Sequence, residues 1–254
     1  MAAIDLNCDM GESYGPWKLG EDELIAPLVS SINVACGFHA SDPATMRRTV
    51  LLAKRHGAAV GAHPSFPDRV GFGRRLLAAT PEEVRDDITY QIGALWAFCQ
   101  AEGVRLRHVK PHGALYNAAA ADPALAAAVC EAVRAVDPEL FVVCLAGSRM
   151  AEVARACCVR WVGEAFADRA YTPHGTLVSR REPGAVLHDP CIVAERVARL
   201  AREGKVLAAD GSELALDART VCIHGDTPGA AALAAAVRQR LEQQGVEVRP
   251  FSGP

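Results

Sequence analysis

The chain has 254 residues, of which 50% are apolar, and its formal net charge is −3. This length suits one large domain with a continuous core, because barrel folds often reach about 250 residues as a single unit. The basic residues are scattered along the chain, which excludes the clustered positive surface of a nucleic-acid-binding protein, and no apolar run approaches the ~20 residues of a membrane span.

The N-terminus and the cysteines indicate a cytoplasmic protein. Residues 1–5 lack the basic segment and the long apolar segment of a secretory signal. The nine cysteines are odd in number, and no two of them have CxxC spacing. This pattern favours reduced thiols over a disulfide framework or a zinc knuckle. We therefore expect a soluble domain of enzyme size in the cytoplasm.

Short apolar runs predict a series of strands along the chain. They lie near residues 4–8, 31–35, 58–62, 106–110, 141–145, 160–164 and 220–224, with a shorter candidate at 246–248. Between them, an oxygen-bearing residue followed by proline predicts five helix starts, because the side chain can cap free amides and proline loses no helical hydrogen bond. These pairs are Asp42-Pro43, Thr80-Pro81, Asp122-Pro123, Asp189-Pro190 and Thr227-Pro228.

The alternation of strands and helices predicts the fold class. It is typical of a mainly parallel sheet, and seven or eight such units in a chain of this length favour an α/β fold closed, or nearly closed, into a (β/α) barrel. Residues 204–217 interrupt the alternation, and Asp210-Gly211 lies there between two apolar runs, as in a β-hairpin. We expect a single barrel domain over residues 1–254 with a hairpin insertion near 204–217.

Polar residues gather directly after the predicted strands, which is the end where barrel enzymes carry their active sites. In chain order they are Asn7, Asp9, Glu12, Asn33, His39, His63, Lys110, His112, Glu164, Arg169, His224 and Asp226. Side chains two apart in a strand share a face, so polar groups of different strands can meet at the barrel mouth. A purely structural alternative is a buried salt bridge between Asp5 and Lys110.

Two kinds of chemistry fit these residues. Histidines 39, 63 and 112, with acids such as Asp9 and Glu164, can ligate a divalent metal and leave a position open for water. The same groups can act as acids and bases without a metal, while Lys110 and Arg169 bind an anion or polarise a carbonyl. The sequence holds no HExxH motif and no GxxxxGK[ST] phosphate loop, so it fixes neither a metal nor a nucleotide site.

Seven segments together carry a resemblance to a known family. They are Asp5–Glu12, Asn33–Ala40, Gly61–Pro64, Gly71–Arg74, His108–Asn117, Glu164–Arg169 and Cys222–Pro228. Read together, they resemble the LamB/YcsF, or lactam-utilisation, family of 5-oxoprolinase A subunits, and they cover nearly the whole chain. Two residues depart from the family pattern, because Ser41 stands where glycine is expected and Ser179 where proline is expected.

The resemblance implies a distorted β/α barrel of the glycoside hydrolase/deacetylase type. It also implies a hydrolase that opens the cyclic amide of 5-oxo-L-proline to L-glutamate, with ATP as co-substrate and with partner subunits B and C. Activity is expected only with the partner subunits, and the nucleotide can bind either to this chain or to the partners, because the sequence does not indicate which subunit contacts ATP. The alternatives are a metal-dependent deacetylase of an amide or carbohydrate, and a non-catalytic subunit that binds the lactam.

Within the implied site we expect two groups of residues. The catalytic candidates are Asp9, His63, Lys110, His112 and Glu164. The substrate-binding candidates are Asn7, Glu12, His39, Arg169, His224 and Asp226. In this hypothesis the acids position water, the histidines move protons, and Lys110 or Arg169 holds a carboxylate or phosphate.

Overall fold

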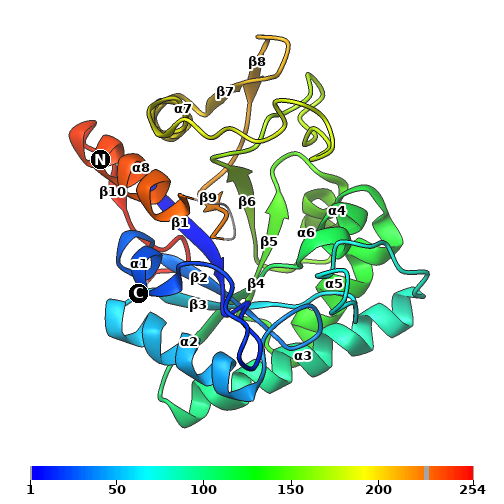
Figure 1. Ribbon diagram of the computed structural model, residues 1–254. Coiled ribbons are helices and arrows are strands. Elements are labelled where there is room, and N and C mark those ends of the chain that lie inside the picture. The colour runs from blue at the N-terminus through cyan, green and yellow to red at the C-terminus, as the bar shows by residue number, and fades with distance from the viewer. Residues whose placement is uncertain (1, 226–228, 254) are drawn as a thin grey trace.

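The computed structural model describes residues 2–225 and 229–253, and its centre is a closed barrel of parallel strands (Figure 1). The strands are β1 (Ala3–Met10), β2 (Ser31–Ala35), β3 (Ala59–His63), β4 (Leu106–Val109), β5 (Phe141–Leu145), β6 (Trp161–Phe166) and β9 (Thr220–Ile223). Each pairs in parallel with the next in this order, and β9 pairs with β1 to close the barrel. The predicted barrel of about seven parallel strands is confirmed, and the short β10 (Glu247–Val248) adds to the first half of β1.

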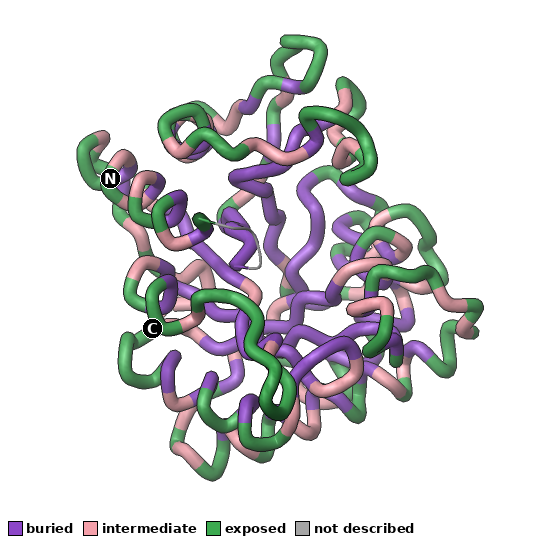
Figure 2. The backbone as a smooth tube through the Cα atoms, in the orientation of Figure 1, coloured by how far each residue is buried: buried purple, intermediate pink, exposed green. Residues whose placement is uncertain are grey.

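Helices connect the strands and pack against one another outside the barrel. They are α1 (Asp22–Ile25), the 3₁₀ turn η1 (Ala26–Leu28), α2 (Pro43–His56), α3 (Pro81–Ala101), α4 (Gly113–Ala121), α5 (Pro123–Val136), α6 (Arg149–Ala156), α7 (Pro190–Glu203) and α8 (Ala230–Gln243). The most extensive contacts between helices join α3 to α5 and α7 to α8. Figure 2 shows the result, with buried barrel strands inside and exposed helix faces and loops outside.

Local capping chemistry explains where most of the helices begin. Asp42, Thr80, Asp122 and Asp189 each accept hydrogen bonds from first-turn amides, with proline next in the chain, as predicted. Thr80 also forms a capping box with Glu83. The fifth predicted start, Thr227-Pro228, lies outside the described residues. Helices α4 and α6 lack the proline signal and were not predicted, although Ser148 caps α6 through the amide of Ala151.

The chain between α7 and β9 forms a two-stranded antiparallel sheet. Strands β7 (Lys205–Leu207) and β8 (Glu213–Ala215) pair across a turn in which the Asp210 carboxylate accepts hydrogen bonds from the amide and hydroxyl of Ser212. Figure 1 shows this hairpin beside α7, away from the barrel. The chain then returns against β6, where the carbonyl of Asp217 would lie 2.0 Å from any Cβ at Gly163.

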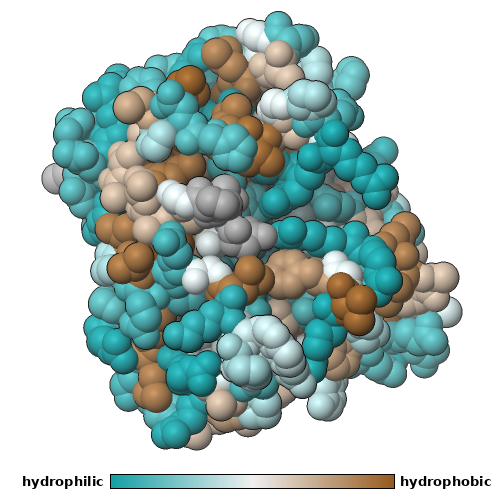
Figure 3. Space-filling view, in the orientation of Figure 1, coloured by the Kyte–Doolittle hydropathy of each residue, from teal (hydrophilic) through white to brown (hydrophobic). Residues whose placement is uncertain are grey.

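The molecular surface is mostly hydrophilic on the face that Figure 3 shows, with smaller groups of hydrophobic residues between polar ones. Exposed large hydrophobic residues include Trp17, Leu24, Val70 and Leu76. In the part of the chain that the structure describes, none of the helices has the length and apolar character needed to cross a membrane.

Candidate active site

The carboxyl ends of the barrel strands open into a cavity of about 1260 Å³. Its lining includes most of the residues expected from the sequence, namely Asp9, Glu12, His63, Lys110, His112, Arg169 and His224. Asn7, His39 and Glu164 are buried directly behind this lining. Asp226, the remaining candidate, lies outside the described residues.

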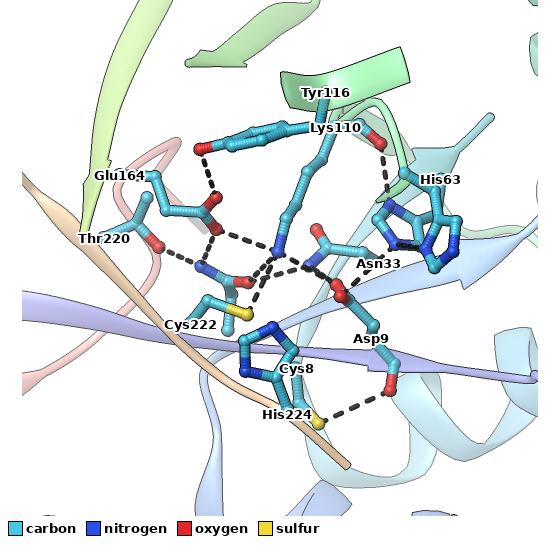
Figure 4. A network of polar contacts seen from close by, with 12 residues as sticks. Cys8, Asp9, Asn33, His63, Lys110, Tyr116, Glu164, Thr220, Cys222 and His224 are labelled. Atoms are coloured by element: carbon cyan, nitrogen blue, oxygen red, sulfur yellow. Dashed lines mark hydrogen bonds and ion pairs between the residues drawn. The ribbon is translucent and has the colours of Figure 1, made fainter. Parts of the chain in front are cut away.

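Lys110 forms the centre of the polar network at the cavity floor. Its Nζ lies 3.0 Å from Asp9 Oδ1 and 3.0 Å from Glu164 Oε1. Nζ also donates to Asn7 Oδ1 at 3.3 Å and to the Cys222 sulfur at 3.1 Å. Figure 4 shows the ammonium group between Glu164 on one side and Asp9 on the other. An ammonium held by two carboxylates in a buried place is a fixed positive charge.

The strand register explains why these residues meet. Asn7 and Asp9 are two apart on β1 and therefore share one face. In the parallel pairing, Asn7 lies opposite Cys222 of β9, and Asp9 lies opposite Asn33 of β2. Glu164 comes from β6, the neighbour of β9. The polar face of each strand therefore turns into the barrel at the same end.

Two buried amides hold the carboxylates in place. Asn33 Nδ2 donates to Asn7 Oδ1 at 2.7 Å and to Asp9 Oδ1 at 2.8 Å. Asn7 Nδ2 in turn donates to Glu164 Oε1 at 2.9 Å and to Thr220 Oγ1 at 2.7 Å. His108 Nε2 lies 2.7 Å from Asn33 Oδ1, so this nitrogen carries the proton that the amide oxygen accepts. Such a connected network fixes both acids relative to Lys110.

Glu164 has no carboxylate oxygen left for the cavity. Lys110 and Asn7 occupy Oε1, and the hydroxyl of Tyr116 donates to Oε2 at 2.7 Å. Burial, reinforced by Glu164, holds the pKa of Tyr116 well above its usual range, so Tyr116 remains a donor. Glu164 therefore balances the charge of Lys110 from behind. Asp9 differs, because it lines the cavity and its Oδ2 faces His63 Nε2 at 3.3 Å.

The charges of this network reinforce one another. Burial alone would raise the pKa of Asp9, yet His63 and Lys110 hold it well below its usual range. Burial alone would lower the pKa of Lys110, yet Asp9, Cys222 and Glu164 hold it well above its usual range. Asp9 is consequently a carboxylate and Lys110 an ammonium at neutral pH.

A cluster of Glu12, His39, His63 and His112 lies beside this network. His39 Nε2 is 3.3 Å from Glu12 Oε1, and His112 Nδ1 is 3.7 Å from the same oxygen. The rings of His39 and His112 stack with centroids 3.8 Å apart, and His112 Nδ1 lies 2.9 Å from His63 Nε2. Burial lowers the pKa of His39 and of His112 well below the usual range. One donor atom from each residue lies within 4.8 Å of the others, as in a metal site.

A second pair consists of His224, which lines the cavity, and the buried Asp168. His224 Nδ1 lies 2.8 Å from Asp168 Oδ1, and the His224 ring stacks on Phe166. Burial alone would raise the pKa of Asp168, but His224 holds it below its usual range. A carboxylate that fixes one nitrogen of a histidine orients the ring for proton transfer at the other.

Arg169 is bound to a loop that lines the cavity. Its guanidinium donates to the carbonyl of Val178 at 2.6 Å and to that of Ala185 at 3.3 Å. Four exposed arginines also line the cavity, namely Arg74, Arg149, Arg180 and Arg181. The cavity therefore combines an acidic and histidine-rich floor with a basic rim, a combination suited to an anionic ligand.

The structural alternative of a salt bridge between Asp5 and Lys110 is wrong. Asp5 accepts hydrogen bonds from the hydroxyls of Ser30 at 2.6 Å, Ser31 at 2.7 Å and Thr220. Lys110 has Asp9 and Glu164 as its ion partners instead. Asp5 is four residues before Asp9 in β1, too far down the strand to share its contacts.

Sequence reasoning missed several contributors to the site. Tyr116 comes from α4, Asp168 follows β6, and Thr220 begins β9, and each binds a residue that was predicted. Tyr116 and Asp168 stand inside segments that carried the family resemblance. Their position in those segments is the signal that could have identified them.

Comparison with known proteins identifies close relatives. A sequence model of the LamB/YcsF family matches residues 4–254. The chain is 54% identical over 252 residues to a protein from Agrobacterium fabrum that bears the name of a 5-oxoprolinase A subunit, and the match covers 99% of each chain. It is also 54% identical to a lactam utilization protein from Thermus thermophilus, whose crystal structure matches with a TM-score of 0.94 over 98% of this chain and 100% of that one.

A more distant structural likeness concerns the fold alone. A family 4 carbohydrate esterase from Streptomyces lividans matches with a TM-score of 0.50 and 12% identity, over 99% of this chain and 93% of that one. This likeness confirms the expected type of barrel. Identity this low says nothing about a shared reaction, so the deacetylase alternative is not favoured over the close relatives.

Proposed function

The chain belongs to the LamB/YcsF family, and on that premise we propose that it is the A subunit of a 5-oxoprolinase and contains the site that opens the lactam ring of 5-oxo-L-proline to L-glutamate. The observation that carries the proposal is Lys110, a buried ammonium fixed by Asp9 and Glu164 at the floor of a cavity with a basic rim. Such a charge can stabilise an oxygen that becomes negative during attack on a carbonyl.

The reaction requires two kinds of help. A five-membered lactam is an unactivated amide, so its carbonyl must become more electrophilic and its nitrogen must gain a proton as it leaves. Transfer of a phosphoryl group from ATP to the amide oxygen supplies the first. Water then forms the new bond to the ring carbon and the carbon–nitrogen bond breaks, which leaves an acyl phosphate; a second water cleaves this acyl phosphate to L-glutamate and phosphate. The chain contains no phosphate-loop motif, so we assign ATP binding to the B and C partner subunits.

The residues divide this work between them. Lys110 faces the oxygen of the activated carbonyl, and Asp9, whose Oδ2 is not bound by Lys110, faces the water together with the histidine cluster. His224, oriented by Asp168, gives the proton to the leaving nitrogen. Three residues act indirectly, because they bind Asp9 or Glu164 and not the substrate; they are Asn7, Asn33 and Tyr116.

The basic rim supports an anionic substrate. 5-Oxo-L-proline carries a carboxylate, and phosphorylation adds a second negative group. Arg74, Arg149, Arg180 and Arg181 line the cavity above Lys110, and arginine binds carboxylate and phosphate oxygens through paired N–H groups. Entry of the phosphorylated lactam from a partner subunit is therefore electrostatically favourable.

The test is glutamate release from 5-oxoproline by the purified chain, with and without ATP and with and without its B and C subunits. We expect release only when ATP and both partners are present. Acetate release from an N-acetylated sugar without ATP would instead identify a deacetylase. Unchanged glutamate release by an assembled complex that carries Lys110→Met would reduce this chain to a non-catalytic lactam-binding subunit.

A further inference from the structure

The protons of two histidine rings can be located from their outer hydrogen bonds. His63 Nδ1 lies 2.7 Å from the carbonyl oxygen of Lys110, and His112 Nε2 lies 2.8 Å from the carbonyl oxygen of Phe72. A carbonyl oxygen only accepts, so each of these nitrogens must carry its hydrogen. In a neutral ring the other nitrogen then holds a lone pair.

The two lone pairs belong to neighbouring nitrogens. The nitrogens in question are His63 Nε2 and His112 Nδ1, and they are 2.9 Å apart. Two unprotonated nitrogens at this distance repel, so the arrangement requires a cation between or beside them. The cation is either one proton that the two rings share or a metal ion that both rings bind.

The distances fit a metal ion. At the tetrahedral angle that zinc prefers, bonds of about 2.0–2.1 Å to two imidazole nitrogens hold those nitrogens about 3.3 Å apart, a little more than the 2.9 Å between His63 Nε2 and His112 Nδ1. Glu12 Oε1 lies 3.7 Å from His112 Nδ1 and 3.3 Å from His39 Nε2. One donor atom each from Glu12, His39, His63 and His112 lies within 4.8 Å of the others.

The surrounding shell is also built as in metal sites. A histidine that ligates a metal almost always donates its other N–H to a carbonyl or carboxylate, and His63 and His112 both do so. The loop that supplies the Phe72 carbonyl is shaped for this contact. Phe72 has φ 54°, a conformation that bulky residues rarely adopt. A Cβ at Gly73 would lie 2.8 Å from the His112 ring and 2.9 Å from Cβ of His39.

From this geometry we infer that Glu12, His39, His63 and His112 form a binding site for one divalent transition-metal ion, with zinc as the metal that suits three imidazoles and one carboxylate. Glu12, His63 and His112 line the cavity, so a further coordination position faces the substrate. When bound there, such an ion lowers the pKa of a coordinated water. That catalytic role rests on the proposed function, whereas the existence of the metal site does not.

The experiment measures metal binding by the isolated chain, without lactam, ATP or partners. The protein is stripped with a chelator and reloaded with Co²⁺, and the visible absorption of the bound ion is followed together with the metal content of the desalted protein. We expect one ion per chain, and zinc should displace the cobalt signal. His63→Gln and His112→Gln should each weaken Co²⁺ binding by about 100-fold or more, while the exposed His188→Asn matches the wild type.

Gly73→Ala supplies a variant in which every ligand remains. It displaces the Phe72 carbonyl from His112 and should weaken Co²⁺ binding by about 10- to 100-fold. A wild-type chain that takes up neither cobalt nor zinc would overturn the inference, as would His63→Gln and His112→Gln variants that bind as tightly as the wild type. Either result would mean that a proton shared by the His63 and His112 rings, and not a metal ion, accounts for their short nitrogen–nitrogen distance. The proposed ring opening is tested separately, by the assay of glutamate release.

Discussion

The imidazole of His108 occupies the space in which a side chain at position 61 would lie. Gly61 is paired with His108 across β3 and β4, and a Cβ at Gly61 would come within 2.1 Å of the ring. The ring itself holds Asn33, which holds Asp9. A glycine in one strand therefore makes room for the residue that begins the chain of contacts to the active site.

Replacement of Gly61 by alanine should strongly destabilise the protein. The clash is with a ring inside the barrel, and overpacking of a core costs about 1–3 kcal/mol or more. Urea unfolding measures the loss, and His108→Ala should remove most of the added cost of Gly61→Ala. Gly93→Ala is the matched control, because Gly93 lies inside α3 with no atom within 4 Å of a new Cβ. That change should stabilise the protein by about 1 kcal/mol. Equal losses at both glycines would contradict this account.

Replacement of Lys110 by methionine should abolish glutamate release and also reduce stability. It leaves Asp9 and Glu164 buried without their shared cation, and breaking a buried ion pair in this way costs about 3–5 kcal/mol. The double variant with Glu164→Gln removes one of the stranded charges. We expect it to regain part of the free energy of unfolding but no activity, as measured by urea unfolding and glutamate assay. Recovered activity in the double variant would show that Lys110 acts only as a structural counter-ion.

The sequence was sufficient to predict the barrel and which end of it carries the site. Parallel strands place their carboxyl ends together, so residues such as Asp9, His63 and Lys110 could be grouped without coordinates. Helix starts at Asp42 and Thr80 were readable because capping depends on only a few neighbouring residues.

Pairings across the barrel could not be read in the same way. Whether Lys110 meets Asp5 or Asp9 depends on the stagger between strands that are not sequence neighbours, and hydrophobic alternation along one strand does not encode it. The same limit applies to Tyr116, which reaches Glu164 from a helix after β4. The stacking of His39 on His112 likewise joins residues from two different strand ends.

Asp5 should make stability fall as the pH rises from about 4 to 6. Burial raises its pKa from 3.8 to about 6 in spite of three hydroxyl donors. The folded state thus holds this proton more tightly than the unfolded state does. The contribution of Asp5 to the free energy of unfolding is therefore complete below the pKa of the unfolded state and is lost as the pH rises through the pKa of the folded state. The change amounts to roughly 3 kcal/mol.

Asp5→Asn should remove this component. The difference in free energy of unfolding between Asp5→Asn and wild type, measured in urea from pH 4 to 8, should shift in favour of the variant as the pH rises. The exposed Asp86→Asn serves as the control. A shift of opposite sign would mean that the three hydroxyls stabilise the Asp5 carboxylate more than burial penalises it.

Ser41→Gly should stabilise the protein by about 1 kcal/mol. Ser41 is buried and has φ 76°. This left-handed conformation costs an L-residue about 1–2 kcal/mol and costs glycine nothing. Part of the gain is offset, because a glycine loses more conformational entropy when the chain folds. The family resemblance led us to expect glycine at this position, and the backbone of Ser41 has the left-handed conformation that glycine adopts without strain. Ser41→Ala keeps the strain and should bring no gain. Thermal unfolding of both variants distinguishes relief of the backbone from loss of the hydroxyl. An alanine variant as stable as the glycine variant would mean that loss of the hydroxyl causes the stabilisation.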